Sequence, residues 1–500
     1  MSDGPVDQAP ARPCRSSVTQ LVKPYKVRAQ VRWQSGRGRR QSIMGMVGLR
    51  ARVGYAVGDF GLNLYWQSLL LFILFFQMDA LGLSAVDAGI SYLIASIWDA
   101  CMDPLMGILS DRTRTRMGRY RPYILFGTVP LALSFWLCFS PPDFLVAGSL
   151  GMLVFATLTH MVLRTCYAVV AIPYSSLTAA ITRDSDERAS LTGWRMLLAF
   201  AGSTSVSAML PLLAGWFGSY SPAAACVGVL AVLAHLVCVA VVRELPPPMP
   251  GAVAPLPGLR ADLGGFLRAV LRNGPLLRLL AATVALHLSL GILMRNIPYL
   301  LKYDLGSDAA LSAQALVWFS AAGVVAVPLW VWVARRWSKA MAWQAGSALV
   351  MVGAVALAFT SPAAFWPTLS CLALISFGHA AHAVAMWSML PDAVDYAHWR
   401  HRRRDEAKVY GLASLIFKLA LGGSAFLGGL ALDGVGYVPG AAQTMASLTG
   451  FRLLAGLVPV LGLGLSMLVI AGYPLTAQRH GRIQTFLGRR RVKQVGDGRR

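Results

Sequence analysis

Charged side chains are scarce in this chain. Asp, Glu, Lys and Arg together make up 13% of the 500 residues, whereas hydrophobic residues make up 56%. The mean hydropathy is +0.57. A soluble enzyme carries far more charge on its surface, so the composition is typical of a polytopic membrane protein.

Cysteines are few and scattered. Their number is odd, and their spacing fits neither a disulfide framework nor a zinc site. We interpret them as small apolar packing residues. The seven are Cys14, Cys101, Cys138, Cys166, Cys226, Cys238 and Cys371.

Enzyme signatures are also missing. The sequence has no GxxxxGK[ST] nucleotide loop, no HExxH, no GxSxG and no paired CxxC. The two glycines of Gly462-Leu463-Gly464 lie in an apolar run without a strand before it, which indicates helix packing rather than a phosphate site. We therefore expect neither catalysis nor a cofactor, and energy from an ion gradient rather than from ATP.

Acidic residues are outnumbered two to one, 22 against 45 Lys and Arg, for a formal net charge of +23. Such an excess would suit a nucleic-acid binder, but its distribution does not. Roughly ten of the basic residues lie in residues 1–50 and about eight follow Leu475, while most others fall in short loops. This is the positive-inside pattern of membrane proteins, and we expect no nucleic-acid partner.

Apolar runs of spanning length dominate the rest of the chain. About twelve occur, each near the roughly 20 residues that a helix needs to cross the hydrocarbon. The sequence therefore predicts an all-α membrane protein. We place the spans at residues 54–78, 85–109, 122–140, 145–178, 190–216, 222–243, 277–302, 310–334, 340–360, 365–390, 409–432 and 450–475.

The loops that follow even-numbered spans carry most of the loop charge, and Lys302 is the nearest exception among the others. By the positive-inside rule these loops and both termini are cytoplasmic, in a multi-pass protein of the inner or plasma membrane. The clusters are Arg112, Arg114, Arg116, Arg119 and Arg121; Arg183 and Arg188; Arg260, Arg268 and Arg272; Arg335, Arg336 and Lys339; and Arg400, Arg402, Arg403 and Arg404.

A Pro-rich stretch between the sixth and seventh spans divides the twelve into two sets of six. This is the layout of transporters built from repeated bundles, which bind substrate near the midplane. Met44 and Met46 are alternative starts, because the preceding residues also resemble translated upstream sequence. The predicted parts are a basic segment 1–50, a six-helix bundle 51–243, a cytoplasmic linker 244–276, a second bundle 277–475 and a basic cytoplasmic tail 476–500.

Asp99 and Asp103 lie inside the second apolar run. Each ionised carboxylate near a bilayer centre costs about 2.5 to 3.5 kcal/mol on insertion scales. Ionisable residues inside a membrane span usually have a function, so we expect one for this pair. Residues i and i+4 share a helix face, and two nearby carboxylates can hold a proton or a monovalent cation. The alternative is a structural pair that neighbouring Arg residues satisfy.

The loop after this span is rich in Gly and Arg. Its topogenic charge alone would explain the Arg residues, but its spacing is more specific and resembles the loop motif of the major facilitator superfamily. The resemblance implies a latch between the two halves of the protein. The matching residues are Gly107, Asp111, Arg112, Gly118 and Arg119.

Further motifs narrow the resemblance. They occur in the same order as in the glycoside-pentoside-hexuronide:cation symporters, the family of the melibiose carriers. The resemblance implies the major facilitator fold, proton- or sodium-coupled symport, and a cation site at Asp99 and Asp103. The motifs are Gly58-Asp59-Phe60-Gly61, Ile97 through Pro104, Asp111 through Pro122, Ile172-Pro173-Tyr174, Glu187-Arg188 through Trp194-Arg195, and Leu390 through Tyr396.

Several positions depart from the melibiose carriers. Asn63 replaces a sugar-binding Asp of the first helix, while Ala171 and Ser175 replace an Asp and a Trp of the fourth. Met102 and Ala168 replace two polar residues of the sodium site, and sodium needs several hard oxygen ligands. The departures favour a proton over sodium, and a substrate other than a neutral galactoside.

Charges in other spans are candidate substrate ligands. Arg164 shares a helix face with Ala171 and Ser175; it either neutralises Asp99 or Asp103 or binds an anionic substrate. Arg195 matches an Arg of the sugar site, and Lys418 lies one turn before the position of a cavity Lys. Asp59 is either structural or cation-facing.

The remaining candidates are weaker. Arg295 either faces the cavity or extends outward to the membrane interface, and we favour the second. His379 and His382 could relay protons, although buried hydrogen-bonded histidines are commoner. For Trp98 and Trp194 we favour packing over stacking on a sugar.

Together these features predict a monomeric symporter for a sugar, glycoside or uronide, with a small-molecule solute and membrane lipid as its partners. A related carrier of a non-sugar solute, such as an organic anion or a lipid-like molecule, is the main alternative. A sensor that has lost transport and a membrane enzyme are less favoured.

Overall fold

The computed structural model describes residues 48–182, 185–245, 268–360, 364–401, 406–476 and 478–487. Nearly all of the predicted basic segment, most of the predicted linker and the end of the predicted tail lie outside these ranges. The side chain of Asp111 also lies outside the described part of the chain.

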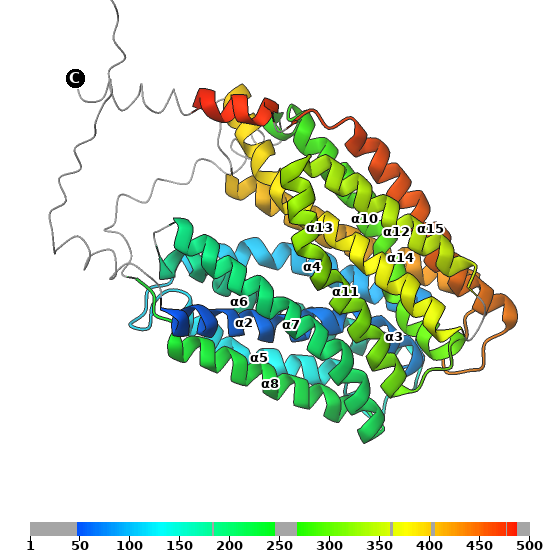
Figure 1. Ribbon diagram of the computed structural model, residues 1–500. Helices are drawn as coiled ribbons and strands as arrows, with labels where there is room; N and C mark the ends of the chain where they lie inside the picture. Colours follow the sequence, from blue (N-terminus) through cyan, green and yellow to red (C-terminus); the bar gives the residue numbers. More distant parts are fainter. Residues whose placement is uncertain are drawn as a thin grey trace, which may run out of the picture. The chain divides into compact units, whose positions relative to one another are not determined.

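Helices are the regular elements of the described ranges (Figure 1). Several begin at a Ser, Thr, Asn or Asp whose side chain accepts a hydrogen bond from a backbone N–H of the first turn; Ser84 and Asp308 are two of these. The helices are α2 (Leu49–Leu71), α3 (Ile73–Asp79), α4 (Ala85–Arg112), α5 (Arg121–Cys138), α6 (Leu150–Ile181), α7 (Ser185–Phe217), α8 (Tyr220–Val241), α10 (Gly274–Tyr299), the π-helix η1 (Leu300–Asp304), α11 (Ala309–Arg336), α12 (Lys339–Ala358), α13 (Phe365–His401), α14 (Glu406–Gly434) and α15 (Met445–Ala471).

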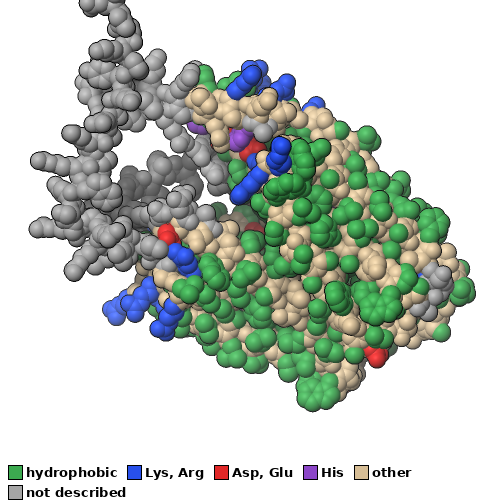
Figure 2. All heavy atoms as spheres, viewed as in Figure 1, with side chains coloured by type: hydrophobic (Ala, Val, Ile, Leu, Met, Phe, Trp, Pro, Cys, Tyr) green, Lys and Arg blue, Asp and Glu red, His purple; other side chains and the backbone are tan. Residues whose placement is uncertain are grey.

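Within the described residues, eleven helices are long and apolar enough to cross a membrane, and the pair α2 and α3, bent by 46°, makes a twelfth span. The predicted all-α membrane protein with twelve spans is therefore confirmed. Figure 2 shows green hydrophobic side chains spread over much of the visible face. In water such a surface would be unstable, whereas in lipid it is the expected surface.

The helices pack as two halves. In the first half, α2 packs against α7 and α8, and α6 packs against α4 and α5. In the second half, α10 packs against α14 and α15, and α12 and α11 pack against α13. The two halves meet along α4 with α14 and along α7 with α11.

The contact between α4 and α14 is close because glycines line it. A Cβ atom on Gly89 of α4 would lie 2.9 Å from the Cα atom of Phe426, and one on Gly429 of α14 would collide with the carbonyl oxygen of Ala85. Small residues let helix backbones approach in a membrane, where the hydrophobic effect does not drive helices together. The first turns of α4 are thus in direct contact with the second half.

One carboxylate ties the halves together beyond this contact. Asp79, at the end of α3, accepts hydrogen bonds from Lys302 of η1, from the Tyr303 hydroxyl at 2.6 Å and from the Tyr437 hydroxyl. Burial raises the pKa of Tyr437 above its ordinary value, and Tyr299 and Asp79 add to this, so its hydroxyl keeps the proton that it donates. We call these four residues, Asp79, Lys302, Tyr303 and Tyr437, the Asp79 cluster.

Candidate functional site

The acidic pair of the sequence prediction lies deep in the interface between the halves. Helix α4 places Asp99 and Asp103 one turn apart; the Asp99 side chain is fully buried and that of Asp103 is 19% exposed. Lys418 of α14 bridges them, with its Nζ atom 2.9 Å from Asp99 Oδ2 and 2.5 Å from Asp103 Oδ2. A cation of the second half is therefore bound by two anions of the first.

Arg164 of α6 contacts the same pair from within the first half. Its Nη1 atom lies 3.3 Å from Asp99 Oδ2, and its Nη2 atom donates to the Tyr92 hydroxyl at 3.1 Å. Its Nε atom donates to His160 at 3.3 Å. The structure thus places Arg164 in the geometry of the internal ion pair rather than free for a ligand. Asp99 Oδ2 accepts from two cations at once.

The expectation that Arg295 extends to the membrane interface is wrong. Arg295 of α10 is 4% exposed, and its Nη1 atom donates to Ser424 Oγ and to the carbonyl oxygen of Gly291, both at 2.9 Å. Its guanidinium also lies 4.5 Å from the centre of the Tyr92 ring. The face of α10 that carries Arg295 packs against α14, and the small Ser424 and Gly291 leave room for the side chain there.

These side chains form a network with an unbalanced charge. The carboxylate network consists of Asp99, Asp103, Arg164, Arg295 and Lys418, so three cations face two anions. Within the described residues, Arg295 has no carboxylate within ion-pair distance, and its Nε and Nη2 atoms have no hydrogen-bond partner. Buried cations normally have a paired anion, so one positive charge here is uncompensated.

A second ion pair joins α2 and α7. Arg195 Nε lies 2.9 Å from Asp59 Oδ2, and the guanidinium stacks over the ring of Tyr174 at 4.9 Å from its centre. The backbone oxygen of Asp59 accepts from the amide of Asn63 at 2.8 Å, and the Asn63 amide oxygen accepts from Ser203 at 3.3 Å. Asp59 is thus paired with Arg195, and both ends of the Asn63 amide are engaged within the first half.

The face of α6 that carries Ala171 and Ser175 is exposed at Ser175 and buried further along the helix. Ser175 is exposed, whereas Ala171 and Ala168 are buried and offer only methyl groups. Trp98 of α4 is 41% exposed, and its indole N–H donates to Thr165 at 2.8 Å. Of these positions, Ser175 is the one with a polar group available to a solute.

Aromatic rings lie beside the carboxylate network. Arg164 stands 5.5 Å from the centre of the Trp66 ring, and Trp66 of α2 stacks on Phe417 of α14 at 6.4 Å. Phe417 in turn meets His287 of α10, edge to face, at 4.7 Å. These rings come from both halves. They could not be predicted from the sequence, because a lone aromatic residue in an apolar run has no distinguishing pattern.

Two histidines considered as a proton relay lie within the second half. His382 Nε2 is 2.8 Å from the Ser347 hydroxyl, while His379 Nδ1 is buried without a hydrogen-bond partner among the described residues. The two rings are 5.9 Å apart. Trp343 packs edge to face on His382 at 5.2 Å, which fits a role in packing.

The predicted latch loop closes on a residue that sequence reasoning missed. Glu244, just after α8, accepts hydrogen bonds from the backbone N–H groups of Arg119 at 2.7 Å and of Tyr120 and Arg121 at 2.9 Å. A carboxylate at the start of α5 also complements the helix dipole. Glu244 is the first residue of the predicted linker, and its only signal in the sequence is that it is an acidic residue directly after an apolar span.

Gly118 makes this closure possible. Its φ of +113° suits glycine, and a Cβ atom there would lie 2.5 Å from the Glu244 carboxyl group. Arg112 lies in the last turn of α4, where its positive charge interacts favourably with the negative end of the helix dipole. Gly107 faces Ile172 of α6 with room for a Cβ atom, so its backbone is not sterically required to be glycine.

The donor set of the carboxylate network does not fit sodium. Both acidic side chains already accept from Lys418, and Met102 and Ala168 add no oxygen. Within the described residues, no group of three or more His, Cys, Asp or Glu could hold a metal ion. The arrangement can exchange a proton between carboxylate and solvent, and it can rearrange its ion pairs.

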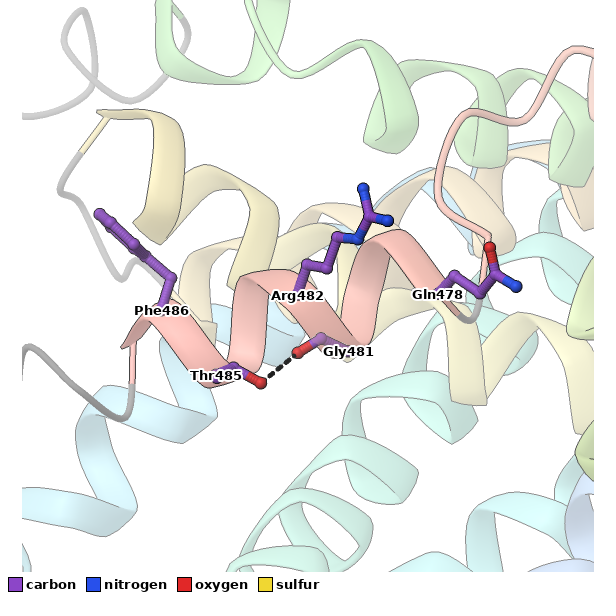
Figure 3. Close-up of a pocket in the computed structure, with 5 residues that line it drawn as sticks. All are labelled: Gln478, Gly481, Arg482, Thr485 and Phe486. Carbon is purple, nitrogen blue, oxygen red and sulfur yellow. Dashed lines mark hydrogen bonds between the residues drawn. The ribbon is translucent and has the colours of Figure 1, made fainter. Parts of the chain in front are cut away.

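Two cavities lie elsewhere in the described part of the chain. One, of about 650 Å³, is lined by Gln478, Gly481, Arg482, Thr485 and Phe486 of the last described helix, residues 478–487 (Figure 3). The other, of about 360 Å³, lies between α5 and α6 and has an almost entirely apolar wall. Neither contains a residue of the carboxylate network.

The chain is similar to known membrane transporters. The model of the family described as MFS/sugar transport protein matches residues 54–477. The isoprimeverose transporter of Lactiplantibacillus pentosus is 29% identical over 86% of this chain and 89% of its own length. The putative glycoside/cation symporter YagG of Escherichia coli (strain K12) is 30% identical over 89% of this chain and 96% of its own length. Among solved structures, the nucleoside transporter NupG superposes with a TM-score of 0.60 at 14% identity, covering 85% of this chain and all of that one.

Proposed function

Because the chain belongs to the MFS/sugar transport protein family, and within it to the glycoside-pentoside-hexuronide:cation symporters, we propose that it couples sugar uptake to a proton. The major facilitator fold with two six-helix halves is confirmed, and the protein is a multi-pass membrane transporter of the sugar symporter type. The coupling ion, the solute and the orientation are the proposed parts. The solute is a sugar, glycoside or uronide.

The bridge from Lys418 to Asp99 and Asp103 carries the proposal. It joins the halves through opposite charges in a buried place, where a charge pair about 4 Å apart is worth on the order of 4 kcal/mol at an effective dielectric constant of 20. A proton on Asp103 removes one partner of Lys418 and weakens the bridge. Protonation and relative movement of the halves are thereby linked, which is the requirement for coupling.

Alternating access follows from the position of the Asp79 cluster. The basic loop 113–120 lies at the opposite ends of α4 and α5 from Asp79, and positively charged loops stay in the cytoplasm. We therefore assign the Asp79 cluster to the external side and both termini to the cytoplasm. In the described conformation the external side is held closed, and opening requires Asp79 to release its three donors.

Arg195 and Ser175 are the polar groups that we assign to the solute. Ser175 is exposed, and the Arg195 side chain is 16% exposed beside its partner Asp59. We assign Asn63 and Ala171 to the surroundings of the solute rather than to its polar contacts, because the Asn63 amide is already hydrogen-bonded at both ends and Ala171 offers only a methyl group. Arg164 and Lys418 reach the solute only when they release the acidic pair.

A solute that carries a negative charge is the second candidate. The uncompensated charge of the carboxylate network favours it, because an anion near Arg295 or Arg164 would restore neutrality. Uronides meet this condition as sugars, and organic anions meet it without a sugar ring. Uptake of a charged and an uncharged sugar separates the two.

Uptake into proteoliposomes tests the proposal. Purified protein is assayed with radiolabelled isoprimeverose and with a labelled methyl glucuronide, under an inward proton gradient, an inward sodium gradient or neither. We expect accumulation of at least one sugar with the proton gradient alone, and its loss in Asp103→Asn. Asp143→Asn, an exposed position, is the matched control and should transport normally. Equal uptake with and without a proton gradient would contradict the proposal.

A further inference from the structure

The ammonium group of Lys418 stands where a coupling cation would need to bind. It lies 2.9 Å from one carboxylate oxygen of Asp99 and 2.5 Å from one of Asp103, and Lys418 as a whole is only 9% exposed. A monovalent cation that bridged the two acids would need the same two oxygens. The side chain is covalently attached to α14, so it competes at this position at a high effective concentration.

Charge balance supports the same conclusion. With Lys418 and Arg164 in contact, two anions face two cations, and the site presents no negative charge to a further cation. Without Lys418, Arg164 would be the one described cation left within ion-pair distance of the two carboxylates, because Arg295 contacts neither of them, so one of the two negative charges would be unpaired. In that case Asp99 Oδ1, which has no hydrogen-bond partner among the described residues, and both oxygens now held by Lys418 would be available to a cation.

We infer that Lys418 is the residue that excludes sodium, acting as a built-in cation at the acidic pair. The carrier then works without sodium, and replacing Lys418 with a neutral residue creates a sodium site. The inference deepens the proposed function, because it names the group that sets ion selectivity at the same site. It concerns cation binding, whereas the proposed function concerns solute uptake driven by protons.

Thermal unfolding of the purified protein in detergent tests the inference. Equal concentrations of sodium, potassium and choline chloride are compared at about pH 8. Wild type should unfold at the same temperature in all three salts. Lys418→Met should gain a sodium-specific increase of about 2 to 4 °C, as expected when sodium is present at about 100 times its dissociation constant.

Two further variants make the test specific. Lys418→Arg keeps a cation beside the acids and should show no response to sodium. The double variant Lys418→Met, Asp103→Asn removes one of the two carboxylates and should lose the response that Lys418→Met gained. A sodium-specific shift in wild type, or a folded Lys418→Met without one, would overturn the inference.

If Lys418→Met does not fold, the binding of radioactive sodium to wild type and to Lys418→Gln is measured instead. Binding to wild type refutes the inference, and binding to Lys418→Gln alone supports it. Failure of the proposed function is recognised separately, as uptake that ignores the proton gradient. The two results are independent, since a protein can exclude sodium through Lys418 whether or not a proton drives its transport.

Discussion

Replacing Asp79 with asparagine should open the end of the protein that the Asp79 cluster holds closed. The Asp79 side chain is 6% exposed and accepts from three donors of the second half. An asparagine has one acceptor oxygen, and its amide nitrogen is itself a donor that would face donors. Asp79→Asn therefore destabilises the described conformation relative to one in which this end of the protein is open and the Asp79 cluster is separated.

The size of the effect follows from the two tyrosines. A hydrogen bond to a charged group contributes about 1.5 to 3 kcal/mol. Lys302 is 47% exposed, and solvent screening reduces its share, so we count only Tyr303 and Tyr437. The loss is then on the order of 3 kcal/mol. Since about 1.4 kcal/mol is a factor of ten, the ratio of the two conformations shifts roughly 100-fold.

Spin-label distances report this shift. Phe144 and Val438, which are 83% and 55% exposed, lie in connections of opposite halves at the Asp79 end, and each is replaced by a labelled cysteine in a background without other cysteines. Asp79→Asn should add a population with a longer distance. Asp308→Asn, at a helix start of the same end, is the control because asparagine caps a helix as well as aspartate does. Identical distributions in Asp79→Asn and its parent would refute the reasoning.

Two further predictions concern stability. Glu244→Gln leaves three N–H groups at the start of α5 with a neutral partner. It should lower the midpoint of thermal unfolding, measured by fluorescence, by about 2 to 4 °C. An unchanged midpoint would show that the charge of the carboxylate does not stabilise the protein. The raised pKa of Tyr437 means that its contribution to stability is complete below the ordinary tyrosine value of 10.0 and is lost as the pH rises above it. Tyr437→Phe should accordingly lessen the loss of stability between about pH 9 and 11 relative to wild type, and parallel curves for the two proteins would argue against this.

The spans and the central acidic pair were predictable because they depend on local sequence. Hydropathy and length define a spanning helix, and the spacing of Asp99 and Asp103 fixes their common face. The same reasoning put Arg164 on the face of α6 that the structure turns toward Asp99. Hydropathy and residue spacing can each be read from the sequence of a single helix, without knowing which other helices pack against it.

Contacts between distant helices could not be read in this way. Arg295 is one cation in an apolar span, and only the packing of α10 against α14 shows that it faces inward. Asp79 finds Lys302 and Tyr437 more than 200 residues away along the chain, and neither pairing has a local signal. The prediction of a linker over 244–276 likewise hid the link from Glu244 to α5.

The contact of Glu244 with the start of α5 has a mechanical consequence. The next residue, Leu245, donates its N–H to the carbonyl oxygen of Ala180 at 2.8 Å, near the end of α6. Glu244 and Leu245, which lie just after α8, thus form hydrogen bonds with the start of α5 and the end of α6. A force applied at residue 245 would therefore act on the ends of α5, α6 and α8 together rather than on α8 alone.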